Sequence, residues 1–234
     1  MVTLRDLGQV PDDAALDQFY RDVLVPSFSP DELVALSALQ EGLQAERRDT
    51  DVVVAVDDEG AVMGGAVGDW DPDSGVYLLS YLAVRPDNRS GGLGTLLMGH
   101  VRAWWEQRGA SVALAEVDDP RHHAVSEHGD PVARLRFYDR IGAQVLGVSY
   151  SQPEVRAGSG RVPGMLLLAF LVKPEARRGD GLRAEVLHRF LANYLALSEG
   201  VAAELVDAEV DALVPALKGC DIVAILPMER YVEI

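Results

Sequence analysis

Residues 89–94 read Arg-Ser-Gly-Gly-Leu-Gly, a combination of residue types that can hold a phosphate group. The apolar residues 77–84 predict a strand before this run, and the residues from 93 onward repeat with a helical period. A glycine turn between a strand and a helix leaves backbone N–H groups free at the positive end of the helix dipole, where an anion binds. The glycines permit a positive φ and close approach of the phosphate, and Arg89 adds a charged donor.

The motifs that the sequence lacks narrow the ligand of this turn. A P-loop requires Lys and then Ser or Thr after the last glycine, whereas Thr95 and Leu96 follow here. The dinucleotide fingerprint requires a third glycine where Leu97 stands. The remaining pattern, R-x-x-G-x-G between a strand and an amphipathic helix, resembles the acetyl-CoA pyrophosphate loop of the GNAT superfamily of N-acetyltransferases. The alternative is an ordinary strand-to-helix turn.

The resemblance implies which residues bind acetyl-CoA. Backbone groups at the end of the strand would pair with the pantetheine arm, and one of their N–H groups would donate to the oxyanion. This pairing requires the strand to splay from residues 112–117, because otherwise the same groups would form an ordinary ladder. The residues expected to bind the cofactor are Leu82, Ala83, Val84, Arg89, Ser90, Gly91, Gly92, Leu93, Gly94 and Thr95.

Acetyl transfer also needs an acid for the leaving thiolate, and Phe137, Tyr138 and Gly142 are similar to a second signature of the family. The resemblance implies that the Tyr138 hydroxyl lies near the thioester sulfur and serves as the general acid. The structural alternative is a half-buried tyrosine with its ring on the core and its hydroxyl in water. The sequence departs from the family at Ala143, where a phenylalanine is usual.

A base is needed because an ammonium group has no lone pair for attack. Glu116 lies near the end of an apolar strand predicted over residues 111–117, where an unpaired carboxylate would be costly to bury. The resemblance implies that Glu116 relays the amine proton through water. The alternative is a structural carboxylate paired with an arginine. A further acid that the family often has on the preceding strand is replaced here by Ser80 and Tyr81.

Residues 118–130 form a long segment with no equivalent in the family pattern. Its His122, His123, Glu127 and His128 meet no standard metal-ligand spacing, so no metal site is expected. The segment is either a lid over the acceptor or an inert surface loop, and residues 150–153 are a second candidate wall of the acceptor site.

The predicted elements are those of an α/β fold with a mixed central sheet flanked by helices, as the resemblance also implies. Helices are expected over 11–25, 29–48, 94–107 and 132–140, and strands over 52–56, 61–68 with a bulge at Gly64 and Gly65, 76–84, 111–117, 143–150 and 165–172. The acetyltransferase core is assigned to residues 1–172. Residues 173–234 form a helical C-terminal extension, with two amphipathic helices and a short strand at 222–226, that serves as a structural cover or a dimer element.

The composition of the chain limits which kinds of partner it is expected to bind. The 37 acidic and 21 basic residues give a net charge of −16, which argues against nucleic acid and is compatible with a cationic acceptor, or with solubility alone. The apolar run 165–172 is too short to cross a membrane, and the first residues show no signal-peptide pattern. The single cysteine, Cys220, is expected to be a small buried hydrophobe in a reducing, cytoplasmic protein.

These observations predict an N-acetyltransferase that moves an acetyl group from acetyl-CoA to a primary amine by direct attack in a ternary complex. The expected acceptor is a small cationic metabolite. The alternatives are a protein lysine or N-terminus as acceptor, a non-catalytic acyl-CoA-binding sensor, and a scaffold whose extension mediates assembly. A homodimer is the expected assembly.

Overall fold

A computed structural model describes residues 2–47, 49–88 and 91–232 of the chain. Its elements, in chain order, are β1 (Thr3–Asp6), α1 (Asp13–Phe19), the π-helical η1 (Tyr20–Leu24), α2 (Val25–Ser27), α3 (Leu36–Gln44), β2 (Thr50–Val56), β3 (Val62–Asp71), β4 (Val76–Val84), η2 (Pro86–Asn88), α4 (Leu93–Arg108), β5 (Val112–Asp118), α5 (Pro131–Arg140), β6 (Gln144–Leu146), β7 (Tyr150–Gln152), β8 (Val162–Val172), η3 (Pro174–Ala176), β9 (Arg177–Arg178), β10 (Gly181–Arg183), α6 (Ala184–Ser198), α7 (Val206–Leu213), η4 (Pro215–Leu217), β11 (Ile222–Val223), β12 (Ile225–Leu226) and α8 (Glu229–Val232).

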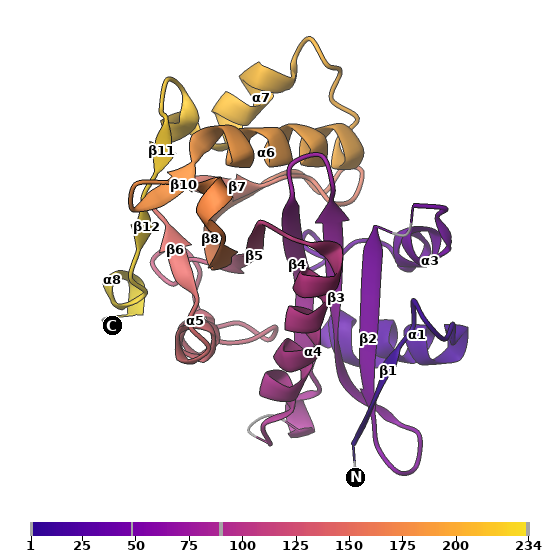
Figure 1. Ribbon diagram of the computed structural model, residues 1–234. Helices are drawn as coiled ribbons and strands as arrows, with labels where there is room; N and C mark the ends of the chain where they lie inside the picture. Colours follow the sequence, from indigo (N-terminus) through magenta and orange to yellow (C-terminus); the bar gives the residue numbers. More distant parts are fainter. Residues whose placement is uncertain (1, 48, 89–90, 233–234) are drawn as a thin grey trace.

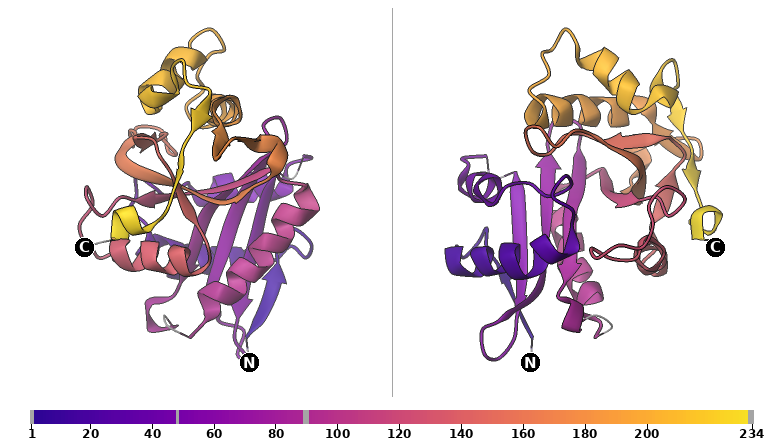
Figure 2. Two further views of the ribbon diagram at one scale, coloured as in Figure 1. Left: turned by 60° about the vertical axis from the view of Figure 1, so that its left-hand side comes forward. Right: turned by 180° about the vertical axis from the view of Figure 1, so that it is seen from behind.

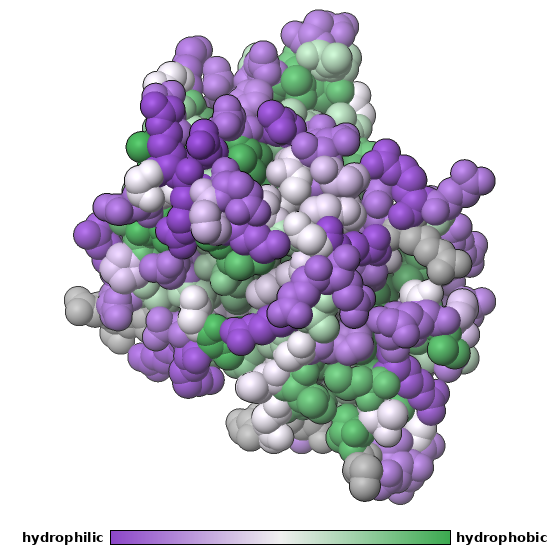
Figure 3. Space-filling model, in the orientation of Figure 1, coloured by the Kyte–Doolittle hydropathy of each residue, from purple (hydrophilic) through white to green (hydrophobic). Residues whose placement is uncertain are grey.

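A central mixed sheet organises the molecule. Within the described residues it has nine strands in the order β1-β2-β3-β4-β5-β8-β6-β12, with β7 paired to β8. Helices α4 and α5 cover one face, and α1, α3 and α6 lie on the other (Figures 1 and 2). The view in Figure 3 is mostly hydrophilic around the helices at its top, in keeping with the net charge of −16. The expected α/β fold is confirmed.

Two helices on the first face begin and end as their sequences indicate. Helix α4 starts after Gly92, which has φ +79°, and ends at Gly109, whose φ of +70° stops it. Helix α5 starts at Pro131 because the Asp130 side chain accepts hydrogen bonds from the backbone N–H groups of Val132 and Ala133, at 2.9 and 3.2 Å.

Strand β4 pairs with its two neighbours over different lengths. Against β3 its pairing continues to Val84, with a bulge at Ser80 that shifts the register between Val67 and Gly68. Against the parallel strand β5 the pairing ends at Leu79 and Ala115. The carboxyl-terminal half of β4 therefore splays from β5, as the cofactor-binding prediction requires.

The helix predicted over 29–48 is wrong at its start, because α3 begins only at Leu36. Ser29 and Glu32 do contact each other in the manner of a capping box, with the Ser29 N–H 3.2 Å from Glu32 Oε2. The residues after them are held in another conformation, since the Tyr81 hydroxyl accepts from the Val34 N–H at 3.0 Å and donates to the Glu32 carbonyl at 2.9 Å. A tertiary contact thus overrides the local helix signal.

Two predictions about strands are also corrected, and one strand was missed. The strand expected over 143–150 is two strands, β6 and β7, because the Gly147 N–H bonds Ala224 O at 2.8 Å and leaves the ladder. The strand β1 was not predicted. The bulge expected at Gly64 and Gly65 lies beside them at Met63, which the register skips. Gly65 instead permits close packing, since a Cβ there would meet the Phe19 ring at 2.7 Å.

The C-terminal extension packs against the sheet. Buried side chains of α6 and α7, among them Leu187, Leu191 and Val210, share a cluster with Leu78 and Leu114 of the central strands. The expected strand at 222–226 is split, with β11 paired to β10 and β12 paired to β6. Cys220 is exposed rather than buried, because it lies in the turn that joins η4 to β11. Among the helices described, none is long and apolar enough to span a membrane.

Candidate active site

The amino end of α4 presents free backbone donors. The Leu96 N–H is bonded to Gly92 O at 3.1 Å, so the N–H groups of Leu93, Gly94 and Thr95 precede the first bond within the helix. Within the described residues no side chain caps them. Two residues predicted for this site, Arg89 and Ser90, lie outside the described residues.

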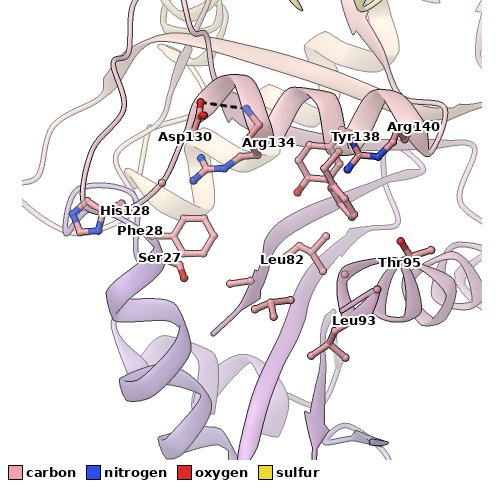
Figure 4. Close-up of a pocket in the computed structure, with 17 residues that line it drawn as sticks. Ser27, Phe28, Leu82, Leu93, Thr95, His128, Asp130, Arg134, Tyr138 and Arg140 are labelled. Atoms are coloured by element: carbon pink, nitrogen blue, oxygen red, sulfur yellow. Dashed lines mark hydrogen bonds between the residues drawn. The ribbon is translucent and has the colours of Figure 1, made fainter. Parts of the chain in front are cut away.

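These donors open into a cavity of about 490 Å³ (Figure 4). Its walls are the end of β4, the amino end of α4, one side of α5, the end of α2 and the turn before α5. The lining residues are Ser27, Phe28, Leu82, Ala83, Val84, Gly92, Leu93, Gly94, Thr95, His128, Gly129, Asp130, Ala133, Arg134, Phe137, Tyr138 and Arg140. Seven of the ten residues predicted to bind the cofactor therefore line one cavity; of the remaining three, Gly91 is exposed immediately before the helix.

The open edge of β4 adds a second set of free backbone groups. The Arg85 N–H donates to Met63 O of β3 at 2.9 Å, and in an antiparallel ladder such bonded positions alternate. Ala83 therefore turns its amide toward β3, whereas Leu82 and Val84 turn theirs toward the gap left by β5. These two residues can pair with an extended ligand in the way a strand would.

Tyr138 projects from α5 toward Leu82 across the cavity (Figure 4). Its side chain is 5% exposed and packs edge-on against Phe137 and Phe170, with ring centroids 5.2 and 5.4 Å away. Burial raises the pKa of Tyr138 to about 12, and the Arg134 charge opposes that shift. In the part of the chain that the structure describes, its hydroxyl has no hydrogen-bond partner, so it is free to bond a ligand in the cavity.

Gly94 has a packing role in addition to its place at the helix end. A Cβ at this position would lie 3.2 Å from the Phe137 ring of α5. The glycine therefore lets α4 and α5 approach closely on either side of the cavity.

Glu116 lies on β5, beyond the point where its pairing with β4 ends. Its carboxylate accepts a short hydrogen bond from the Tyr150 hydroxyl, one from Gln152 Nε2 at 3.0 Å and one from the Tyr194 hydroxyl at 3.3 Å. Burial raises the pKa of Glu116 to about 7, and these three donors oppose the shift. No arginine among the described residues pairs with it, so its partners there are these three neutral donors rather than the arginine of the structural alternative.

A second cavity, of about 700 Å³, contains Glu116 in its wall. It lies between α3 and α6 and reaches the β4 bulge. Its lining residues are Val34, Ala38, Leu39, Arg47, Asp49, Thr50, Asp69, Trp70, Asp71, Pro72, Asp73, Leu78, Ser80, Tyr81, Glu116, Gln152, Val155, Phe190, Asn193, Tyr194, Ala196, Leu197 and Ser198. The extension thus supplies one wall of this cavity through α6, and Gln152 comes from the segment predicted as an acceptor wall.

The long segment 118–130 borders the first cavity rather than the second. Its His128, Gly129 and Asp130 line the first cavity, and none of its residues lines the second. Within the segment, Arg121 bonds the buried Asp119, and His123 Nε2 lies 2.9 Å from Pro163 O. Residues 2–47, 49–88 and 91–232 contain no group of three or more His, Cys, Asp or Glu side chains that could hold a metal ion.

Comparison with known proteins identifies the class of this chain. The profile of the acetyltransferase (GNAT) family matches residues 16–143, more than half of the 234 residues. The chain belongs to the acetyltransferase (GNAT) family and is an acyl-CoA N-acyltransferase. No curated protein gives a significant sequence match.

Solved structures of several family members share the fold. A Bacteroides thetaiotaomicron protein described as a GNAT-family acetyltransferase is 22% identical, with a TM-score of 0.58 over 86% of this chain and 99% of its own. A Staphylococcus epidermidis protein described as an acetyltransferase is 12% identical, with a TM-score of 0.53 over 72% and 99%. The ribosomal-protein-S18-alanine N-acetyltransferase of Escherichia coli is 17% identical, with a TM-score of 0.51 over 78% and 99%. At these identities the likeness concerns the fold alone.

The first cavity fits the acyl-CoA donor that the family uses. Free N–H groups at the amino end of α4 suit a pyrophosphate, and the open edge of β4 suits the amides of a pantetheine arm. Arg140 adds positive charge to the wall, and Arg134, which also lines it, is paired with Asp118 at 3.0 Å. The residues present therefore match the anionic and the amide parts of the donor.

Sequence reasoning missed Asp69, Asp71 and the α6 residues of the second cavity. The strand predicted over 61–68 stopped one residue short of Asp69, although β3 continues to Asp71. An aspartate next to Trp70 at the end of a strand gives little signal by itself. The contribution of α6 depends on how the extension docks, which no local pattern encodes.

Proposed function

We propose that this protein transfers an acetyl group from acetyl-CoA to a primary amine of a small cationic molecule, by direct attack in a ternary complex. The observation that supports this best is the position of Glu116, a half-buried carboxylate without an arginine partner among the described residues, where β4 and β5 part. It lines a cavity of about 700 Å³, a size that suits a small molecule. The carboxylates of this cavity favour a cationic one.

Glu116 is the proposed base. An aliphatic ammonium has a pKa of about 10 and must lose a proton before its nitrogen can attack. Since the pKa of Glu116 is raised to about 7, the group combines proton affinity with a substantial deprotonated fraction at neutral pH. It accepts the ammonium proton, directly or through one water, and releases it to solvent.

The Leu82 N–H is the proposed oxyanion donor. The amine nitrogen forms a bond to the thioester carbonyl carbon, and negative charge develops on the carbonyl oxygen. The backbone of Leu82 faces the gap between β4 and β5 from a rigid strand, so its N–H is already oriented toward that charge.

Tyr138 is the proposed acid. As the carbon–sulfur bond breaks, the electron pair goes to sulfur, and the hydroxyl of Tyr138 donates its proton there. The attacking nitrogen then loses a second proton to solvent, and solvent returns one proton to the tyrosine. One proton is therefore released for each acetyl group transferred. The pKa of Tyr138 is raised to about 12, so its hydroxyl is protonated at neutral pH and has a proton to donate.

A screen of primary amines for thiol release from acetyl-CoA tests the proposal. Sustained release with a small cationic amine, together with an equal amount of N-acetylated product, is expected. Release only with peptides that offer a lysine or a free N-terminus would contradict the small acceptor, and tight acetyl-CoA binding without release would indicate a sensor.

A cytoplasmic location and a homodimer also belong to this proposal. The single cysteine, exposed in a turn and without a disulfide, supports a reducing compartment. Light scattering of the full chain tests the dimer, and a monomeric mass would contradict it.

A further inference from the structure

The second cavity carries more negative charge than one reacting ammonium requires. Besides Glu116, its wall contains Asp49, Asp69, Asp71 and Asp73. Of the described residues that line it, Arg47 alone is basic, and its Nε lies 3.3 Å from Asp49 Oδ2. The remaining carboxylates are therefore not neutralised by that arginine.

Asp69 and Asp71 are held in place by neutral donors. Asp69 accepts from the hydroxyls of Ser80 and Thr50, the latter at 2.7 Å. Asp71 accepts from Asn193 Nδ2 at 2.9 and 3.1 Å. Neither carboxylate has a cationic partner among the described residues, although charges withdrawn from water are usually paired. Burial raises the pKa of Asp69, and the nearby charges of Asp51 and Asp49 raise it further.

A separate observation at the Glu116 end of the cavity also indicates a missing donor. Gln152 lines the cavity, is only 7% exposed and donates from Nε2 to Glu116. Its buried Oε1 has no hydrogen-bond partner in the described part of the chain. A buried acceptor without a donor is costly, and an ammonium group of the acceptor would supply the donor.

The two ends of the cavity are close together. Glu116 accepts from the Tyr194 hydroxyl at 3.3 Å, and Asp71 accepts at 2.9 Å from Nδ2 of Asn193, the preceding residue of α6, so adjacent residues of one helix contact both ends. Apolar side chains of Leu78 and Phe190 also line the cavity. A short apolar spacer therefore suits the distance between a cation beside Glu116 and one beside Asp69.

We propose that Asp69 and Asp71 form a subsite for a second cationic group of the acceptor, so that the substrate is a small diamine or oligoamine with an apolar spacer. This inference rests on the proposed function, since the reacting amine occupies the Glu116 end. Asn193 of α6 holds Asp71 in position, and through it the C-terminal extension contributes to substrate specificity.

A pair of amines matched in length tests the subsite. Putrescine and butylamine share a four-carbon spacer and differ in the second ammonium group. Thiol release from acetyl-CoA is measured with both amines in the wild type, Asp69→Asn, Asp71→Asn and Asp17→Asn. Asp17 is exposed on α1 and lines neither cavity, so its variant controls for loss of one negative charge.

The wild type and Asp17→Asn should prefer putrescine by about tenfold or more in kcat/KM. Asp69→Asn should remove most of that preference by raising KM for putrescine, whereas kcat/KM for butylamine should stay the same. The isosteric amide preserves the contacts with Ser80 and Thr50, and if Asp69→Asn does not fold, Asp71→Asn provides the same comparison. Equal kcat/KM for the two amines in the wild type, or a preference retained in both variants, would overturn the subsite alone.

If no amine supports thiol release, the proposed function fails. Binding of putrescine to the protein then tests the subsite separately. Putrescine should then still raise the unfolding temperature of the wild type and of Asp17→Asn, but not that of Asp69→Asn. The absence of any shift in the wild type would overturn the subsite as well.

Discussion

Glu116 shows how the surroundings of one residue set an acidity that suits its proposed role as the base. Burial disfavours the charged carboxylate, while Tyr150, Gln152 and Tyr194 donate hydrogen bonds that favour it, and burial dominates. With a pKa of about 7, about half of the molecules hold Glu116 as carboxylate at neutral pH. This balance makes the proposed base sensitive to pH in the working range.

The pH profile of Glu116→Gln tests the base. In the wild type, kcat/KM should rise with pH through about 7, because Glu116 must lose its proton before it can accept one from the ammonium. The wild-type rate should level off above about pH 7, whereas the rate of the glutamine variant, slowed about a hundredfold near pH 8, should keep rising with the fraction of free amine. The loss should shrink toward pH 10, where the amine deprotonates without help.

The matched control is Glu106→Gln, since Glu106 is exposed on α4 and lines neither cavity. Its profile should coincide with that of the wild type. A Glu116→Gln profile that still levels off above about pH 7 would assign the base to another group.

Tyr138→Phe removes one hydroxyl and little packing, since the ring remains between Phe137 and Phe170. Turnover with the best amine should fall by about a hundredfold, while the affinity for acetyl-CoA measured by calorimetry stays nearly the same. Full turnover in a variant whose rate is limited by the chemical step would show that Tyr138 is structural.

At the residue scale, the sequence predicts the residues that carry a recognisable pattern. Tyr138 follows a phenylalanine ahead of a glycine, and Glu116 interrupts an apolar strand, so both could be proposed. Asp69 has no such signal, and Gln152 is indicated only through its segment 150–153, because the contacts of both residues are with partners far away in the chain, such as Thr50 for Asp69 and Glu116 for Gln152.

At the scale of elements, two features form the proposed cofactor site, the free amino end of α4 and the splayed end of β4. A strand whose ladder ends at Leu79 on one side and continues to Val84 on the other exposes backbone groups without disrupting the sheet. The bulge at Ser80 produces this arrangement and also aims the Ser80 hydroxyl at Asp69. The bulge at Ser80 thus affects the walls of both cavities.

The charge at the amino end of α4 can be varied at Gly92, whose φ is +79°. Asn and Asp tolerate this left-handed conformation better than other residues and are nearly equal in size. Gly92→Asp should weaken acetyl-CoA binding by about tenfold or more relative to Gly92→Asn, because its carboxylate repels the pyrophosphate and competes for the same N–H groups.

Calorimetry at low and high salt measures the affinity of both variants for acetyl-CoA. The difference in affinity between them should become smaller at high salt, because salt screens the repulsion. Equal affinities of the Asp and Asn variants at low salt would contradict a phosphate site at this helix end.

Local signals predict elements well where no distant contact competes with them. The glycines at 92 and 109 mark the ends of α4, and Asp130 with Pro131 marks the start of α5. The start of α3 could not be predicted, because the hydroxyl of Tyr81, far along the chain, holds Val34 in place. Likewise, the separation of β6 from β7 depends on Ala224.

At the scale of the whole molecule, the C-terminal extension packs on the central sheet and lines the second cavity, the proposed acceptor site. Its helix α6 covers β4 and β5 through one face and lines the cavity with Phe190, Asn193 and Tyr194. The amphipathic pattern predicts that this segment packs on something. The surface that it covers depends on the shape of the whole sheet and on the area buried there. The local sequence of the segment does not contain that information.

Two leucines on α6 separate packing from surface effects. Leu187→Ala should lower the free energy of unfolding by about 2–5 kcal/mol, because the side chain is fully buried against the central strands. Leu197→Ala should change it by less than about 0.5 kcal/mol, since Leu197 is 87% exposed. Chemical denaturation measures both, and equal small losses would show that the extension adds little to the stability of the core.

The central claim is that acetyl-CoA and the amine meet in one ternary complex at the gap between β4 and β5. Initial rates measured over a grid of acetyl-CoA and amine concentrations, with both products quantified, test it most directly. We expect intersecting double-reciprocal lines and one N-acetylated amine for each thiol released. Parallel lines, which indicate an acetylated enzyme, or thiol release without acetylated amine would contradict the claim.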